Sequence, residues 1–183
     1  MPIVVHKYGG TSIADAERIK RVARRICDEH DSGHQVVAVV SAMGDTTDRL
    51  TDLARNITSS PMPREMDLLL STGEIVSCTL VAMAIQETGY RAVSLSGAQA
   101  GILTDTAYSR ARITGMDTER IHRELELGNI VIVAGFQGIT EDMDVTTLGR
   151  GASDLTAVAL AAGLKAERCE IYTDVEGIYT ADP

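Results

Sequence analysis

Apolar residues along the chain fall into short runs separated by longer stretches with helical spacing. The runs have the length of β-strands, and we expect strands over residues 3–8, 36–40, 92–95, 130–134 and 169–173. Apolar runs without polar alternation are typical of strands that are buried on both faces, as in a parallel sheet.

The segments between these runs carry apolar residues three and four positions apart, which is the spacing of one helix face. The first helix starts after Thr11 or Ser12, either of which can cap it, and Gly33 closes it. We expect the remaining helical segments over residues 50–57, 66–70, 75–85, 116–127 and 153–162, with the second and third interrupted near Gly73.

Two segments lack a regular period. Residues 97–115 contain three glycines and are expected to be irregular, whereas residues 137–151 are rich in Gly and Thr and are expected to form a loop or a hairpin.

Strands thus alternate with helices, which predicts an α/β protein with a mainly parallel central sheet in a three-layer α/β/α sandwich. The 183 residues fit one domain. Because the chain stops directly after a strand and a turn, at Ala181-Asp182-Pro183, we expect residues 1–183 to be a piece of a larger domain.

Charge and composition argue against some classes of binding partner and indicate the cellular compartment. The net charge of -9 argues against a nucleic-acid partner, and no basic amphipathic helix or apolar run of about 20 residues indicates a membrane partner. Cys27, Cys78 and Cys169 are far apart, and the N-terminus has no signal-peptide pattern, so we expect a cytoplasmic protein with reduced cysteines. The four histidines share no spacing with Cys or Asp, so no metal site is predicted.

The first predicted strand ends in Lys7-Tyr8-Gly9-Gly10 and leads into a helix. Glycines at such a turn let free backbone N–H groups and the helix dipole approach a phosphate, and Lys7 adds a positive charge beside them. A plain Gly-Gly turn with a solvated lysine remains the alternative.

Two further elements carry charge at the start of helices or at helix breaks. Arg150, between Gly149 and Gly151, can clamp a carboxylate or phosphate, and Asp154 either orients the ammonium group of Lys7 or is a first-turn acid. Glu74, after Gly73, either receives a ligand ammonium group or caps a helix.

Strand ends supply the last candidates. Ser41 and Thr47 follow the strand 36–40, at the sheet edge where ligands of open α/β sheets bind, and either contact a ligand or cap the next helix. The segment 173–183 leaves the final strand and is alternatively a surface turn around Gly177.

In this order, the segments 7–12, 40–44, 71–74, 135–138, 149–151 and 173–183 resemble those of the aspartate kinases, which belong to the amino acid kinase family. The resemblance covers essentially the whole chain. It implies that residues 1–183 are the N-terminal portion of the catalytic domain, without the C-terminal part of the nucleotide lobe and the ACT domains. It implies the amino acid kinase fold and ATP-dependent phosphorylation of the side-chain carboxylate of L-aspartate, the first step toward lysine, threonine and methionine.

The resemblance also implies roles for individual residues. ATP is contacted by Lys7, Tyr8, Gly9, Gly10, Thr173, Asp174, Tyr179 and Asp182. Aspartate is contacted by Ser41, Thr47, Glu74 and Arg150, with Glu74 on the α-ammonium group and Arg150 on the α-carboxylate. Lys7 and Asp154 are the catalytic pair, and Mg²⁺ is held mainly through the phosphates of ATP.

Two positions depart from the family pattern. Ala152 stands where the family usually has a second glycine, and its methyl group crowds the turn unless φ is negative, while Leu155 stands where threonine is usual. The full-length protein is expected to be a homo-oligomer. The alternatives are another amino acid kinase, acting on glutamate, N-acetylglutamate or a nucleoside monophosphate, and a non-catalytic fragment that retains the fold.

Overall fold

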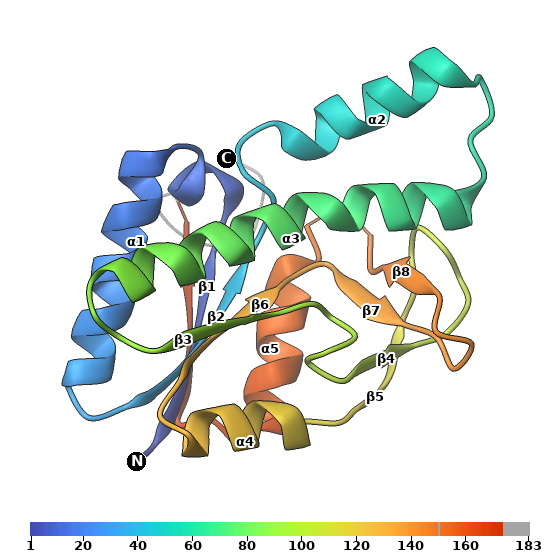
Figure 1. Ribbon diagram of the computed structural model, residues 1–183. Helices are drawn as coiled ribbons and strands as arrows, with labels where there is room; N and C mark the ends of the chain where they lie inside the picture. Colours follow the sequence, from blue (N-terminus) through green and yellow to red (C-terminus); the bar gives the residue numbers. More distant parts are fainter. Residues whose placement is uncertain (150, 174–183) are drawn as a thin grey trace, which may run out of the picture.

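The computed structural model describes residues 1–149 and 151–173, and a five-stranded parallel sheet lies at its centre (Figure 1). The strand order is β3-β6-β2-β1-β9, and every neighbouring pair is parallel. The strands are β1 (Ile3–Tyr8), β2 (Gln35–Val40), β3 (Ala92–Leu95), β6 (Ile130–Ala134) and β9 (Arg168–Tyr172). All five strands that the apolar runs predict are therefore confirmed.

Helices cover both faces of this sheet, which confirms the three-layer sandwich (Figure 1). On one face, α1 (Ala16–Asp31) and α3 (Pro63–Glu87) pack their buried apolar residues against the sheet. On the other face, α4 (Glu119–Glu126) and α5 (Ser153–Gly163) do the same. The 3₁₀ helix η1 (Gly10–Ile13) joins β1 to α1, and α2 (Thr46–Ile57) packs on α3.

Local sequence explains where α1 begins and ends. The side chain of Asp15 accepts a hydrogen bond from the N–H of Arg18 at 2.8 Å, which satisfies one free donor of the first turn. Gly33 follows the last turn with a φ of +99°, a conformation that glycine adopts without a steric penalty. The cap is therefore Asp15, and the expected cap at Thr11 or Ser12 is wrong because those residues form η1.

The predicted break near Gly73 is wrong, because α3 is one continuous helix. A Cβ atom at Gly73 would lie 2.9 Å from the Cβ atom of Ala42 and 3.4 Å from a methyl carbon of Thr46. The glycine therefore allows the loop after β2 to pack closely against α3, at the cost of a lower helix propensity.

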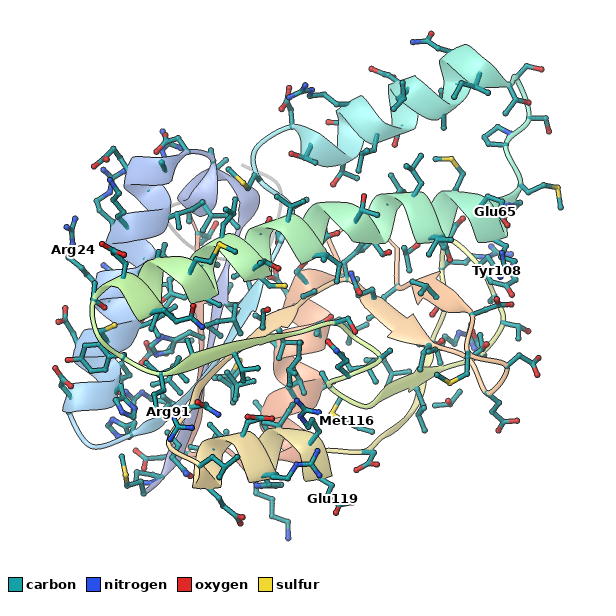
Figure 2. The ribbon with its side chains drawn as sticks, viewed as in Figure 1. Arg24, Glu65, Arg91, Tyr108, Met116 and Glu119 are labelled. Carbon is teal, nitrogen blue, oxygen red and sulfur yellow. The ribbon has the colours of Figure 1, made fainter. Side chains whose placement is uncertain are left out.

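A second sheet, absent from the sequence prediction, lies beside the first. Its four strands have the order β5-β4-β7-β8 and comprise β4 (Ile102–Thr104), β5 (Ile113–Met116), β7 (Gln137–Ile139) and β8 (Val145–Thr147). β7 and β8 pair antiparallel, which confirms the hairpin alternative for residues 137–151. The predicted start of a helix at Met116 is wrong, because β5 ends there and α4 starts at Glu119; Figure 2 labels both residues.

Asp67 fixes the start of α3 to this second sheet. Its carboxylate is fully buried and accepts hydrogen bonds from the N–H groups of Ser109 and Thr147 and from the hydroxyl of Thr147. Nearby, the hydroxyl of Tyr108 donates to Asp144 at 2.8 Å, and Arg64 Nε in the first turn of α3 donates to the same carboxylate at 2.9 Å. These bonds hold the end of β8, which leads to Gly149, in place.

By length and composition alone, α3 is a helix that could cross a membrane, contrary to the expectation of no such run. Its buried positions include Cys78, Val81 and Ile85, which pack in the apolar core with α1 and the sheet. Those contacts are typical of the core helix of a folded domain.

Candidate functional site

The carboxyl ends of β1, β2 and β6 and the start of α5 enclose a cavity of about 330 Å³. Because these strands are parallel, the segments that follow them emerge at the same edge of the sheet. The cavity is lined by Lys7, Gly10, Ser41, Ala42, Gly44, Thr47, Asp48, Glu74, Phe136, Gly151, Ser153 and Asp154. The structure thus brings six of the predicted site residues, Lys7, Gly10, Ser41, Thr47, Glu74 and Asp154, into one cavity.

The turn after β1 lies close to the turn after β2. The N–H of Gly44 donates to the carbonyl of Gly10 at 3.1 Å, and the N–H of Ser41 donates to the carbonyl of Tyr8 at 3.2 Å. A Cβ atom at Gly10 would lie only 2.5 Å from the carbonyl oxygen of Ala42. Gly10 therefore meets a steric requirement of the fold, in addition to any role in ligand binding.

Two residues that line the cavity, Lys7 and Asp154, form an ion pair. The distance from Lys7 Nζ to Asp154 Oδ1 is 2.7 Å, and the lysine side chain is 12% exposed. β1 and the first turn of α5 thus place a positive charge beside the Gly9-Gly10 turn, with Asp154 at ion-pair distance from it. The predicted role of Asp154 in orienting Lys7 stays a prediction.

Glu74 is a nearly buried carboxylic acid that lines the same cavity. It is 3% exposed, and its Oε1 accepts a hydrogen bond from the N–H of Ala42 at 3.1 Å. Its Oε2 has no hydrogen-bond partner among the described residues. Burial raises the pKa of Glu74 to about 7, although the hydrogen bond from Ala42 favours the charged form. A buried acid with an unpaired oxygen facing a cavity is suited to bind a cationic group.

The loop before α5 accommodates the departure from the family pattern. Ala152 has a φ of -76°, so its methyl group causes no backbone strain, and it packs in an apolar cluster with Phe136 and Leu148. Gly149 and Gly151 adopt positive φ values of 93° and 77°. Arg150 lies outside the described residues, although Gly151 beside it lines the cavity.

Tyr8 and Thr173 lie apart from this cavity. Side chains alternate along β1, so Tyr8 faces α1 and stacks on Tyr172 with ring centroids 4.9 Å apart. Both Tyr8 and Thr173 line a second cavity of about 570 Å³ beside α1. Their predicted contact with a nucleotide stays a prediction, and Asp174, Tyr179 and Asp182 lie outside the described residues.

The sequence analysis assigned no ligand contact to the other six lining residues, which are Ala42, Gly44, Asp48, Phe136, Gly151 and Ser153. Ser153 is buried at the start of α5, and Phe136 has a φ of +68° and donates its N–H to the hydroxyl of Thr156 at 3.0 Å. The Gly135-Phe136 step after β6 was a visible signal, because it follows a buried strand as the other cavity segments do. Ser153 has no comparable signal.

Comparison with known proteins gives consistent matches over the whole chain. The sequence profile described as "Amino acid kinase family" matches residues 2–183. The aspartokinase of Geobacillus stearothermophilus is 60% identical over 183 residues, which are 100% of this chain and 45% of that protein. The chain thus spans under half the length of such relatives.

Two solved structures have the same fold. Aspartate kinase from Synechocystis superposes with a TM-score of 0.85 at 49% identity, over 99% of this chain and 29% of that one. E. coli aspartokinase III, solved in complex with aspartate and ADP, superposes with a TM-score of 0.87 at 29% identity, over 99% of this chain and 51% of that one.

The close approach at Gly10 predicts a large difference between two neighbouring glycines. We expect Gly10→Ala to lower the free energy of unfolding by about 2 kcal/mol, because the Cβ atom meets backbone that cannot move away. Gly9→Ala is the matched control: φ is -71° and the nearest atom would be Lys7 Nζ at 3.6 Å, so no loss is expected. Urea denaturation measures both, and equal losses would contradict the steric argument.

The raised pKa of Glu74 predicts a pH-dependent loss of stability. The folded-state pKa of about 7 lies above the ordinary value of 4.5, so the folded state holds a proton that the unfolded state has lost between these values. Stability should therefore fall as pH rises from 4.5 to 7, by about 3 kcal/mol relative to Glu74→Gln. Denaturation of both proteins across this range measures the difference, and parallel profiles would refute it.

Proposed function

The chain belongs to the amino acid kinase family, and we propose that it forms the N-terminal part of the catalytic domain of an aspartate kinase. In that role it binds ATP and L-aspartate and contributes to transfer of the γ-phosphoryl group to the side-chain carboxylate, giving 4-phospho-L-aspartate. The observation that carries the proposal is one cavity that is lined by both the cation Lys7 and the buried acid Glu74.

The cavity wall beside β1 suits the phosphates of ATP. Lys7 supplies positive charge there, and the Gly9-Gly10 turn supplies backbone N–H groups at the start of η1. We assign the remaining nucleotide contacts to Tyr8, Thr173, Asp174, Tyr179 and Asp182 on the family resemblance. ADP occupies the E. coli relative, which supports a nucleotide ligand here.

The wall formed by α3 suits a free amino acid. Glu74 Oε2 is available for an ammonium group, and Ser41 and Thr47 line the same cavity. Arg150, flanked by Gly149 and Gly151, is assigned to the α-carboxylate. Aspartate is bound in the E. coli relative, which supports this choice of ligand.

These positions account for the chemistry without a general base. A carboxylate is already a nucleophile, and its oxygen forms a bond to the γ-phosphorus of ATP while the bond to the bridging oxygen of ADP breaks. Catalysis then depends on alignment and on charge stabilisation. Lys7 and the glycine N–H groups offset the charge on the transferred group, and Asp154 holds Lys7 in position.

Mg²⁺ is proposed as the companion of ATP, held mainly through phosphate oxygens, where it would neutralise phosphate charge. The carboxylates of the cavity fit this arrangement. Ala42 donates to one oxygen of Glu74, and Lys7 pairs with Asp154, so both of these carboxylates already have a partner within the protein.

Other family activities remain as alternatives. A kinase for N-acetylglutamate or a nucleoside monophosphate has no ligand ammonium group to place at Glu74, and glutamate is longer than aspartate by one methylene. A non-catalytic fragment that retains the fold is the alternative from a different class.

We further propose that the full-length protein is cytoplasmic and homo-oligomeric and binds neither nucleic acid nor membrane. The three cysteines are free, as in a reducing compartment. The net charge of -9 disfavours phosphate backbones. Val76 and Met83, 52% and 56% exposed on α3, support an apolar contact between subunits.

Lys7→Ala in the intact protein should lower kcat about 10²–10³-fold, because the transferred phosphoryl group loses its charge partner. Lys20→Ala is the control, since Lys20 is an exposed residue of α1 paired with Glu17. A coupled assay of ADP release measures kcat, and circular dichroism checks the fold. Near-normal turnover by a folded Lys7→Ala variant would remove Lys7 from the mechanism.

A panel of acceptors tests the substrate. Hydroxylamine traps acyl phosphates as hydroxamates, and we expect hydroxamate from L-aspartate but much less from glutamate, N-acetylglutamate or N-acetylaspartate. The last compound keeps the reacting carboxylate and lacks only the ammonium group, so equal rates with it would contradict the assignment of Glu74. Calorimetry showing aspartate binding without ATP binding would favour the non-catalytic alternative.

A further inference from the structure

A second group of ionisable residues lies on the α1 side of the sheet, on the face opposite to Lys7. His6 on β1, Glu29 on α1 and Glu170 on β9 bring one nitrogen and two carboxylate oxygens within 4.8 Å of one another. These residues are far apart in sequence, so spacing does not predict the group. The proposed transfer reaction makes no use of it.

His6 is the unusual member. Its side chain is 0% exposed, and its Nε2 has no hydrogen-bond partner among the described residues. Nε2 lies 3.6 Å from Glu170 Oε2 and 3.8 Å from Glu29 Oε2, too far for hydrogen bonds. Leaving a buried polar atom without a partner costs free energy. An ion bound between the three side chains would give Nε2 a partner.

The other nitrogen of His6, Nδ1, is within hydrogen-bond distance of Tyr8, and either group can be the donor. Nδ1 lies 3.1 Å from the hydroxyl oxygen of Tyr8. If Nδ1–H donates to that oxygen, the lone pair of Nε2 points at the carboxylates. An imidazole held by a hydrogen bond on its far nitrogen is the usual arrangement of a histidine ligand.

Arg168 orients both carboxylates. Its NH2 group donates to Glu29 Oε1 at 2.5 Å, and its Nε donates to Glu170 Oε1 at 2.7 Å. Each carboxylate therefore turns its second oxygen, Oε2, toward His6. The hydroxyl of Tyr172 also donates to Glu170 Oε2, which keeps a further lone pair for a ligand.

We propose that His6, Glu29 and Glu170 form a binding site for a divalent transition-metal ion of the zinc class. Ligand atoms about 2.1 Å from a tetrahedral ion lie roughly 3.4 Å apart, so the two distances from Nε2 need to shorten by a few tenths of an ångström. The two carboxylate oxygens lie within 4.8 Å of each other and approach further when an ion binds between them. Imidazole nitrogen selects such an ion over Mg²⁺ or Ca²⁺, which prefer oxygen ligands. Water would complete the coordination.

A metal ion can reach this site from solvent, and its binding would stabilise the contact between β1, α1 and β9. Glu29 and Glu170 are 16% and 35% exposed, so an ion can enter from their side while His6 stays buried. The ion would join β1, α1 and β9 directly. It would therefore add stability to the strand that leads toward the predicted nucleotide contacts at Thr173 and beyond.

Metal binding by the intact protein tests the proposal, with Zn²⁺ itself as the probe. We expect equilibrium dialysis to give one Zn²⁺ per chain, and saturating Zn²⁺ to raise the thermal midpoint. His6→Gln should weaken binding by about tenfold or more and abolish the thermal shift. His122→Gln, on α4 across the sheet, is the matched control and should change neither.

Co²⁺ supplies an independent readout. Tetrahedral Co²⁺ with nitrogen and oxygen ligands absorbs visible light strongly, whereas the hexaaqua ion absorbs it only weakly. We expect the band in the wild-type protein and not in His6→Gln. If His6→Gln fails to fold, Glu170→Gln replaces it as the test. Absence of stoichiometric Zn²⁺ binding, or equal binding by the wild type and a folded His6→Gln or Glu170→Gln variant, would overturn the proposal.

Discussion

The alternation of side chains along β1 is the constraint on which both sites depend. β1 lies between β2 and β9, so its two faces are covered by different helices. Lys7 faces α5 and pairs with Asp154, while His6 and Tyr8 face α1. A shift of one residue in the register of β1 would exchange these faces and remove the cation from the cavity. One strand thus separates the proposed phosphate-binding residues from the proposed metal site.

Much of the fold could be predicted because the central sheet is buried on both faces. The uninterrupted apolar run of β2 is visible in the sequence, and its complete burial in the structure explains why. The location of the cavity could also be predicted from the sequence. Lys7, Ser41 and Asp154 adjoin strand ends or a helix start, and the parallel topology alone brings such positions to one edge.

The failed predictions concern features that long-range packing determines. Gly73 has the sequence signature of a helix break, yet contact with Ala42 explains its presence inside α3. The strands of the second sheet are three or four residues long, too short for a clear period. Only the packing of β1, α1 and β9 brings together His6, Glu29 and Glu170, so their spacing along the sequence gives no signal of the group.

Ala152 shows how a departure from the family pattern can be favourable. Its backbone has a φ of -76°, which any L-residue adopts, so a glycine at this position would gain no freedom that the native conformation uses. Alanine instead restricts the unfolded chain and contributes about 0.4–1 kcal/mol to stability through that loss of disorder. The segment before α5 therefore loses less conformational entropy when it folds. The loop that lines the cavity at Gly151 is restricted toward its folded conformation already in the unfolded chain.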